Sequence, residues 1–197
     1  MSKYLKLFFL ALALCVGAAW AGDFEDGVAA HDKKDFVTAL GKFKSAAAQG
    51  DASAQLNVGI MYEAGQGVVQ DYAEAVRWFK LAATQGDAQA QTKLAYMYNK
   101  GRGVVQDYVE AVRWYKLAAV QGLAQAQINL GVVHTYGQGV VQDYVRAHMW
   151  YNLAAVKGDL DSVKYRDIVA KLMTPQQVVE AQKLARECQA RNFKNCD

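Results

Sequence analysis

The chain has 197 residues, of which 53% are hydrophobic and 21% charged, and its 22 basic and 19 acidic residues give a formal net charge of +3. No run of five or more basic residues occurs, so the sequence lacks the electrostatic footprint of a nucleic-acid-binding protein. A single proline in a chain of this length favours a mostly helical protein.

Residues 1–21 have the features of a secretory signal peptide. Lys3 and Lys6 form a short basic start, and an apolar run follows from Leu7 to Ala18. Ala19-Trp20-Ala21 then places small residues where a signal peptidase reads them. We therefore expect export to the periplasm or the cell exterior.

Cleavage after Ala21 would leave a mature chain that begins at Gly22, with 20 basic and 19 acidic residues and a net charge of +1. No other stretch approaches the roughly 20 apolar residues that span a bilayer, so we expect no membrane association after signal removal. The alternative is a lipid anchor on Cys15, which the bulky Leu14 before it disfavours.

Residues 22–51 are expected to form N-terminal capping helices. The stretch from Phe24 to Ala30 looks like the remnant of one helix, and Asp35 to Ala48 is predicted as a second. In this interpretation Phe43 takes the place of a tryptophan that recurs later in the chain.

Trp78, Trp114 and Trp150 lie 36 residues apart, and 23 of 36 positions are identical between residues 71–106 and 107–142. A fixed period of this length indicates stacked supersecondary units, none of which can bury its apolar face alone. We expect repeats at 52–86, 88–122 and 124–158.

The segment 88–122 shows how one repeat is predicted to fold. Asp87 can cap a helix over 88–98 and Gly101 can end it, while Asp107 can cap a second helix that runs to about residue 120. Two antiparallel helices joined by a short glycine loop make a helical hairpin.

Residues 159–197 are expected to close the array with two capping helices. Leu160 to Leu172 takes the place of a first helix, and Thr174-Pro175 caps a last helix from Gln176 to about Ala190. Terminal units of a stacked array must present a polar outer face, which explains why these segments depart from the repeat.

Cys188 and Cys196 are the two cysteines that remain after signal removal. Eight residues of continuous helix would separate their Cα atoms by about 12 Å, whereas a disulfide needs roughly 4.4–6.8 Å. Either the chain folds back over residues 191–195 or the thiols stay free. The poor helix formers at residues 192–195 favour folding back, so we predict one disulfide that contributes roughly 2–3 kcal/mol to stability.

These elements predict an all-α solenoid of about five antiparallel helical hairpins with a 36-residue period. The patterns Leu94-Ala95-x-x-Tyr98, Leu130-Gly131 and G-x-G-V-V-Q-D-Y-x-x-A-x-x-W-x-x-x-A-A-x-x-G resemble those of Sel1-like repeats, which are relatives of the tetratricopeptide repeat. The resemblance covers nearly the whole mature chain. It implies a right-handed superhelix that acts as an adaptor or scaffold for other proteins.

Positions that vary between repeats cluster on the first helix of each hairpin, where they are free to contact a partner. By analogy with tetratricopeptide arrays, this helix lines a concave groove. The expected protein-binding residues are Asn57, Ile60, Gln89, Lys93, Tyr96, Lys100, Asn129, Val132 and Tyr136, and Thr92 and Asn99 are also expected to line the groove. Their mixture of aromatic, aliphatic and amide groups suits an extended peptide or a partner helix. The alternative is that adjacent units bury Leu56, Ile60 and Ile128.

No catalytic, metal or cofactor site is predicted. The three G-x-G tripeptides follow helices and lack the lysine of phosphate loops, so we interpret them as turns. His31, His134 and His148 have no metal-ligand spacing, and His134 replaces the tyrosine at positions 62 and 98. Glu74/Arg77 and Glu110/Arg113 are typical of a solvated helix face.

Two other functions are compatible with the sequence. Some cysteine-rich secreted members of this repeat class are associated with binding or hydrolysing β-lactams, but this chain has no cysteine pair in each repeat and no S-x-x-K nucleophile pattern. The array could also assemble only with itself. We favour a non-catalytic scaffold for a protein or peptide partner.

Overall fold

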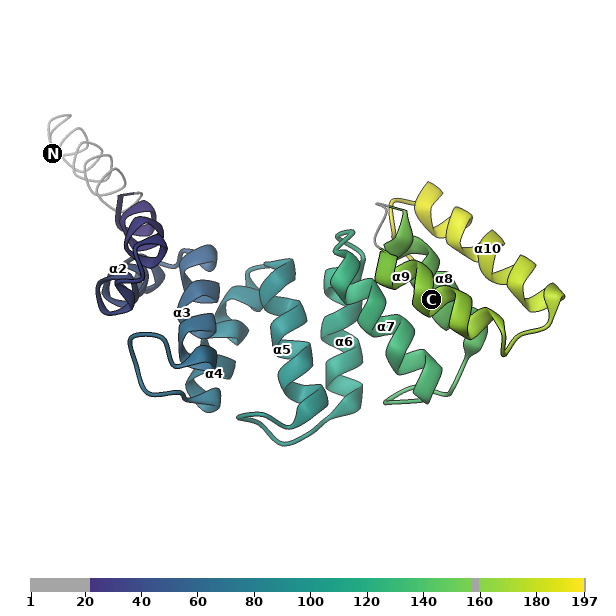
Figure 1. The fold of residues 1–197 in the computed structure, drawn as a ribbon, viewed down its shortest axis with the longest axis horizontal. Helices are drawn as coiled ribbons and strands as arrows, with labels where there is room; N and C mark the ends of the chain where they lie inside the picture. Colours follow the sequence, from purple (N-terminus) through teal and green to yellow (C-terminus); the bar gives the residue numbers. More distant parts are fainter. Residues whose placement is uncertain (1–21, 157–159, 197) are drawn as a thin grey trace, which may run out of the picture. The chain divides into compact units, whose positions relative to one another are not determined.

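The computed structural model describes residues 22–156 and 160–196, so the predicted signal peptide lies outside the described residues. Helices connected by short loops make up this part of the chain, and it contains no strand (Figure 1). The chain divides into two compact units, Met1–Gln85 and Gly86–Asp197. The prediction of an all-α solenoid of helical hairpins is confirmed.

The first unit contains a helical segment over residues 22–32, then α2 (Phe36–Ala48), α3 (Ala52–Ala64) and α4 (Tyr72–Thr84). Helix α3 packs against both α2 and α4. Phe43, Val58 and Met61 are central members of its buried core, and Trp78 packs against this core from α4.

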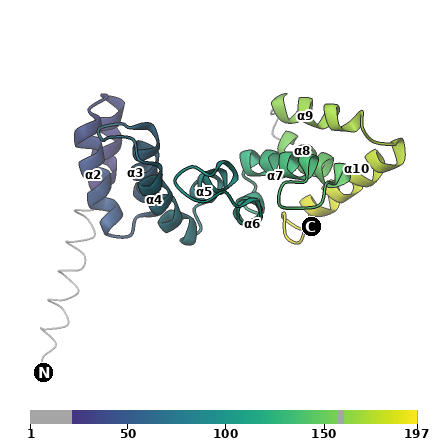
Figure 2. The ribbon, with the colours of Figure 1, turned by 90° about the horizontal axis from the view of Figure 1, so that it is seen from below.

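The second unit contains α5 (Ala88–Lys100), α6 (Tyr108–Ala119), α7 (Ala124–Tyr136), α8 (Tyr144–Ala155), α9 (Leu160–Ala170) and α10 (Pro175–Ala190). Helix α6 packs against α5 and α7, and α8 packs against α7, α9 and α10. Within this unit, α6 lies behind α5 and α7 in the view of Figure 1, as the turned view in Figure 2 shows.

Short polar side chains begin most of these helices, as the sequence predicts. The carboxylates of Asp87 and Asp107 accept hydrogen bonds from the backbone N–H groups of Ala90 (2.7 Å) and Glu110 (2.9 Å). Thr174 forms a capping box with Gln177 at the start of α10. Helix α7 differs, because Leu123 occupies its N-cap position and offers no side-chain hydrogen bond.

The glycines of the G-x-G turns have structural roles. Gly65, Gly101 and Gly137 end α3, α5 and α7 in the left-handed conformation. A Cβ atom on Gly67 or Gly139 would collide with the backbone at the start of α2 or α6, so the second glycine lets each turn lie against the preceding hairpin. This arrangement agrees with their interpretation as turns.

On three of the first helices a glycine faces an aromatic ring on the following helix. A Cβ atom on Gly59 would lie 2.6 Å from the Phe79 ring, and one on Gly131 would collide with the Tyr151 ring. Gly27 has the same relation to Phe43. The prediction that Phe43 takes the tryptophan position is therefore wrong: it occupies the position of Phe79, one residue later, and its large ring fills the space left by a glycine.

The three repeated tryptophans are buried to different degrees. Trp150 is 1% and Trp114 5% exposed, whereas Trp78 is half-buried. The Trp114 indole N–H donates a hydrogen bond to Glu110 (2.8 Å), and the Arg113 guanidinium lies 4.5 Å from the ring centroid. Two of the three repeated tryptophans therefore belong to the buried core, and the third lies at its edge.

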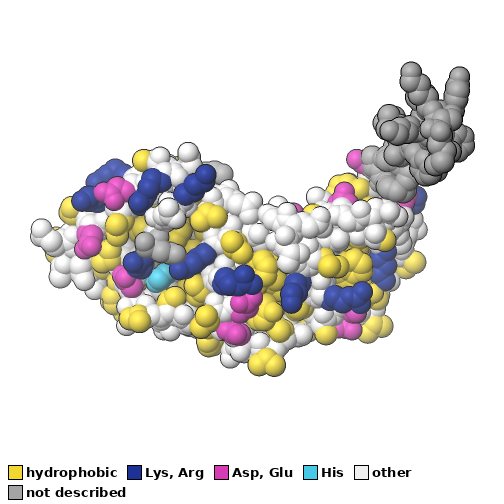
Figure 3. All heavy atoms as spheres, turned by 180° about the vertical axis from the view of Figure 1, so that it is seen from behind, with side chains coloured by type: hydrophobic (Ala, Val, Ile, Leu, Met, Phe, Trp, Pro, Cys, Tyr) yellow, Lys and Arg dark blue, Asp and Glu magenta, His cyan; other side chains and the backbone are white. Residues whose placement is uncertain are grey.

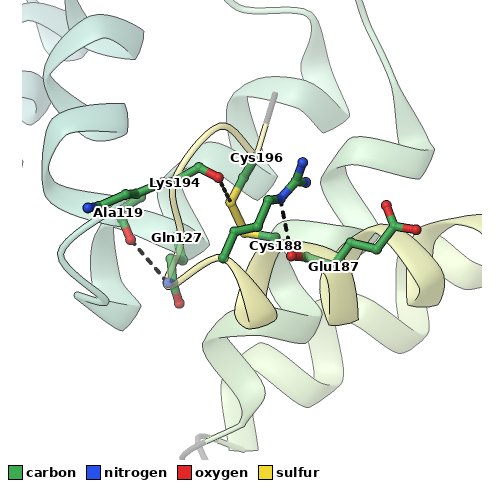
Figure 4. The surroundings of a disulfide bond; sticks show 7 residues. Ala119, Gln127, Glu187, Cys188, Lys194 and Cys196 are labelled. Carbon is green, nitrogen blue, oxygen red and sulfur yellow. Dashed lines mark hydrogen bonds between the residues drawn. A yellow bond between two sulfur atoms is a disulfide. The ribbon is translucent and has the colours of Figure 1, made fainter.

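The predicted disulfide between Cys188 and Cys196 is confirmed, with Cα atoms 5.0 Å apart (Figure 4). Helix α10 ends at Ala190, and the chain then folds back through Asn192, Phe193 and Asn195, all of which have positive φ. Cys188 is fully buried, so the bond fixes the end of the chain to the interior of the second unit.

Candidate peptide-binding surface

The predicted binding residues of the second unit form two stripes, one on α5 and one on α7. Gln89, Lys93, Tyr96 and Lys100 follow a spacing of three or four residues, which places them on one side of α5. The two ends of this stripe, Gln89 and Lys100, are exposed, and its middle is half-buried.

The stripe on α7 is exposed at one end only. Asn129 and Val132 are half-buried, and Tyr136 is 70% exposed at the end of the helix. Val132 also packs against the core that contains Tyr151 and Val169. The α5 and α7 stripes, defined by these seven residues, are called the α5–α7 face below.

In the first unit, Asn57 and Ile60 lie on α3 and are both half-buried. The Asn57 side-chain amide donates a hydrogen bond to the Ser53 carbonyl oxygen (2.9 Å), which leaves its side-chain oxygen for other contacts. Because Ile60 is only half-buried, the alternative interpretation, in which adjacent units bury it, does not hold for this residue.

Four neighbouring positions are not available to a partner, because their side chains are buried. Leu56 and Ile128 are 7% and 8% exposed, as the alternative interpretation expected. The prediction that Thr92 and Asn99 line the groove is wrong, because both side chains are buried, at 8% exposure. Thr92 donates a hydrogen bond to the Ala88 carbonyl oxygen, and Asn99 donates one to Gln138 across to the next hairpin.

An aromatic and basic cluster lies at the C-terminal half of α5. The Arg102 guanidinium is 5.7 Å from the centroid of the Tyr96 ring, a distance at which a cation interacts favourably with an aromatic face. Lys100 is exposed one turn beyond Tyr96.

The histidines do not form a site. His134 and His148 are buried, at 5% and 2% exposure, and the ring of His31 is within 3.4 Å of Gln66. Burial lowers the pKa of His148, and the positive charge of the nearby Arg166 lowers it further. This ring is therefore neutral at pH 7. Across residues 22–156 and 160–196, no group of three His, Cys, Asp or Glu side chains is placed to hold a metal ion.

The predicted ion pairs on the second helices are present and exposed. Arg77 contacts Glu74 at 3.1 Å and Arg113 contacts Glu110 at 2.6 Å. Exposed pairs of this kind contribute about 0.2–1 kcal/mol, so they stabilise the helix face slightly.

A pocket of about 240 Å³ lies between α8, α10 and the C-terminal tail, and sequence reasoning did not predict it. Its walls bring together Asp143, Val145, Arg146, Glu180, Leu184, Arg191 and Cys196. Arg146 already contacts Asp143 at 3.3 Å. The pocket depends on the fold-back of the tail, and no motif marks segments this far apart as neighbours.

Comparison with solved structures identifies similar folds. The crystal structure of c5321, a protective antigen present in uropathogenic Escherichia coli strains that displays an SLR fold, has a TM-score of 0.75 and 34% sequence identity. That match covers 81% of this chain and 34% of the antigen, so the chain spans about a third of its length. A Sel1 repeat protein from Oxalobacter formigenes has a TM-score of 0.66 and 29% identity, with 86% of this chain and 77% of that protein covered.

No curated protein matches the sequence. In the part of the chain that the structure describes, every helix is too short or too polar to span a bilayer. The family model for the Sel1 repeat matches residues 52–87, 88–123 and 124–159, which together make up more than half of the chain. Proteins built from this repeat are generally protein-interaction scaffolds and typically not enzymes. The chain therefore belongs to the Sel1 repeat family.

Proposed function

We propose that this chain is an exported, non-catalytic scaffold that binds a protein or an extended peptide through the first helices of its hairpins. The observation that carries the proposal is the contrast between conserved and variable repeat positions. The residues that build the hairpin seams, such as Trp114 and Ala111, recur from repeat to repeat, whereas Lys93 and Tyr96 do not. Variable residues that remain accessible are the ones a repeat array can use for recognition.

The exposure pattern of the α5–α7 face supports the same proposal. The α5 stripe is exposed at both ends and the α7 stripe at one end, while their other residues are half-buried, so the face offers a partner both side-chain contacts and apolar surface. Among the described residues, the histidines are buried or contact a glutamine side chain, so the surface suits binding better than catalysis.

Affinity capture with the mature protein tests the binding surface. The parent is compared with a Lys93/Tyr96/Asn129 triple alanine variant and with a matched Lys80/Val109/Gln189 triple alanine variant, whose three positions are exposed on other helices. We expect the first variant to lose a captured protein that the second retains. Equal capture by all three proteins would move the binding site away from this face.

Export and the absence of catalysis have their own tests. We expect the exported protein to begin at Gly22 when its N-terminus is sequenced, and a chain that keeps residues 1–21 in the cytoplasm would contradict export. Nitrocefin turnover by the parent, well above that of the Lys93/Tyr96/Asn129 variant, would favour the alternative of a β-lactam-hydrolysing enzyme.

A further inference from the structure

The pocket between α8, α10 and the C-terminal tail brings charged side chains of both signs around one cavity of about 240 Å³. Asp143 and Arg146 come from the start of α8, Glu180 from the first half of α10, and Arg191 from the residue that ends α10. In the view from behind, basic and acidic side chains are intermixed with hydrophobic ones on this part of the chain (left in Figure 3).

The two guanidinium groups of the pocket are each held through one nitrogen atom. The Arg146 Nε lies 3.3 Å from the Asp143 carboxylate, and the Arg191 Nε donates a hydrogen bond to the Glu187 carbonyl oxygen (3.2 Å). Within residues 22–156 and 160–196, the terminal nitrogens of both groups make no hydrogen bond. Such nitrogens bind carboxylate oxygens well, so this side of the pocket suits the anionic group of a ligand.

Glu180 supplies the opposite charge. Its side chain is exposed and has no ion pair or hydrogen bond with any residue that the structure describes. The other carboxylate of the pocket is already occupied, because Asp143 accepts a hydrogen bond from the Arg146 backbone N–H (2.9 Å) and contacts the Arg146 side chain. Glu180 is therefore the acceptor that remains for the cationic group of a ligand.

The spacing along α10 separates the two charges. Arg191 follows Glu180 by eleven residues, which is about three helical turns and about 16 Å along the axis, so both lie on the same side of the helix. A ligand that contacts both residues must carry its cation and its anion at opposite ends. A molecule with adjacent charges, such as a single α-amino acid, is too short for this.

An apolar wall lies between the charged groups. Val145 and Leu184 are half-buried, and Cys196, which the disulfide with Cys188 holds in place, completes the lining. Pockets for drug-sized ligands enclose roughly 300–1,000 Å³, so a cavity below this range suits a smaller molecule with a short apolar middle.

We infer that this pocket binds a small elongated zwitterion of the class of a free dipeptide. Its ammonium group contacts Glu180, and its carboxylate contacts the terminal nitrogens of Arg146 and Arg191. Its apolar middle packs on Val145 and Leu184. The inference goes beyond the proposed scaffold function, which uses the first helices of the hairpins and not α8 or α10.

NMR titration of the purified protein with three related probes tests the inference. The probes are L-alanyl-L-leucine, its N-acetyl form, which lacks the ammonium group, and its C-terminal amide, which lacks the carboxylate. We expect the free dipeptide to bind about tenfold more tightly than either blocked form, because each blocked form loses one charge-assisted contact. The amide signals that shift should include those of Val145 and Leu184.

Two variants assign the two ends of the ligand. Glu180→Gln is expected to weaken binding of the free dipeptide about tenfold and to leave the affinity of the N-acetyl form unchanged, since that form has no ammonium group to lose. Arg191→Gln should weaken the free dipeptide and leave the affinity of the amide unchanged. A variant that only disturbed the structure would weaken all three probes alike.

The matched controls are Glu25→Gln and Arg186→Gln, which make the same charge changes at exposed positions outside the pocket and should bind like the parent. Undetectable binding of the free dipeptide, equal affinity for the three probes, or equal weakening by pocket and control variants would each overturn the inference. None of these results bears on the scaffold function, which the capture experiment tests separately.

Discussion

At the scale of single residues, equivalent positions of the repeat acquire different surroundings. Trp150 is almost fully buried, Trp114 is nearly so, and Trp78 remains half-buried, although all three occupy the same place in their hairpins. Their identity and spacing could be predicted from the sequence. Their exposure could not, because the packing around each ring depends on neighbours whose contacts the repeat pattern does not specify.

The small residue of each first helix that packs against the second helix also differs in its surroundings from one hairpin to the next. Gly131 lies against the buried Tyr151 ring, while the equivalent positions of the preceding hairpin hold Ala95 and Tyr115, both of which are buried. The repeat can therefore accommodate a methyl group at this position when the surrounding residues are arranged for it. In the hairpin of α7 and α8 the ring occupies the space that a Cβ atom would need.

We predict that Gly131→Ala destabilises the protein by about 1–3 kcal/mol, the usual cost of adding a methyl group to a packed core. Chemical denaturation of the purified mature protein measures this change. The control is Gly41→Ala in α2, where a Cβ atom would meet no atom within 4 Å. That variant should gain about 0.4–1 kcal/mol, because alanine reduces the entropy of the unfolded chain. If both variants were stabilised, the close helix approach at Gly131 would be refuted.

At the scale of helices, N-cap residues and helix-ending glycines made the helix boundaries predictable to within about two residues. Asp87, Asp107 and Gly101 begin and end helices where the sequence places them. Helix α9 is shorter than predicted, because it ends at Ala170 and the chain turns before Leu172. Phe43 lies eight residues after the N-cap Asp35, whereas Trp78 lies seven residues after the N-cap Asp71, so the distance from the cap distinguishes the two aromatic positions.

Helix α7 is the exception to the capping pattern. The equivalent first helices α3 and α5 begin at Asp51 and Asp87, and each carboxylate accepts a 2.7 Å hydrogen bond from a backbone N–H group. At the same position before α7, Leu123 leaves the first N–H groups without a side-chain partner. Those groups also carry the positive end of the helix dipole.

We predict that Leu123→Asp raises the free energy of unfolding by about 0.5–1 kcal/mol, because the new carboxylate can cap α7 and interact with its dipole. The midpoint of urea denaturation at pH 7 measures the gain. The reverse exchange, Asp87→Leu, should lower stability by a similar amount at the start of α5. A lower midpoint for Leu123→Asp would show that the half-buried leucine contributes more through packing than a cap can supply.

At the scale of the whole molecule, the family and the solenoid were readable from the 36-residue period, because each hairpin repeats the same seam. Only part of the proposed binding face could be predicted from the sequence. Counting along a helix placed Lys93, Tyr96 and Lys100 on one side, but it could not reveal that Asn99 reaches Gln138 and is buried. The pocket beside Cys196 was beyond prediction, because it joins segments that only the folded tail brings together.

A stacked array distributes its stability among neighbouring hairpins, so a change at one end has a graded effect along the chain. The disulfide closes the C-terminal end, where Cys188 is fully buried and Phe193 lies near the loop that contains Gly122. Its loss frees the tail and removes a constraint on the unfolded state. The helices that depend most on this constraint are α10 and those it packs against.

We predict that Cys188→Ala/Cys196→Ala lowers the free energy of unfolding by roughly 2–3 kcal/mol, as the loop-entropy model gives for a short closed loop. Hydrogen exchange followed by mass spectrometry should show the largest acceleration in α10, a smaller one in α8, and parent rates in α3 and α4, because local opening follows contiguous packing. Reduced parent protein is the control and should reproduce the same gradient. Uniform acceleration over all helices would indicate that the chain unfolds as one cooperative block, and an unchanged profile would mean that the tail is held by packing alone.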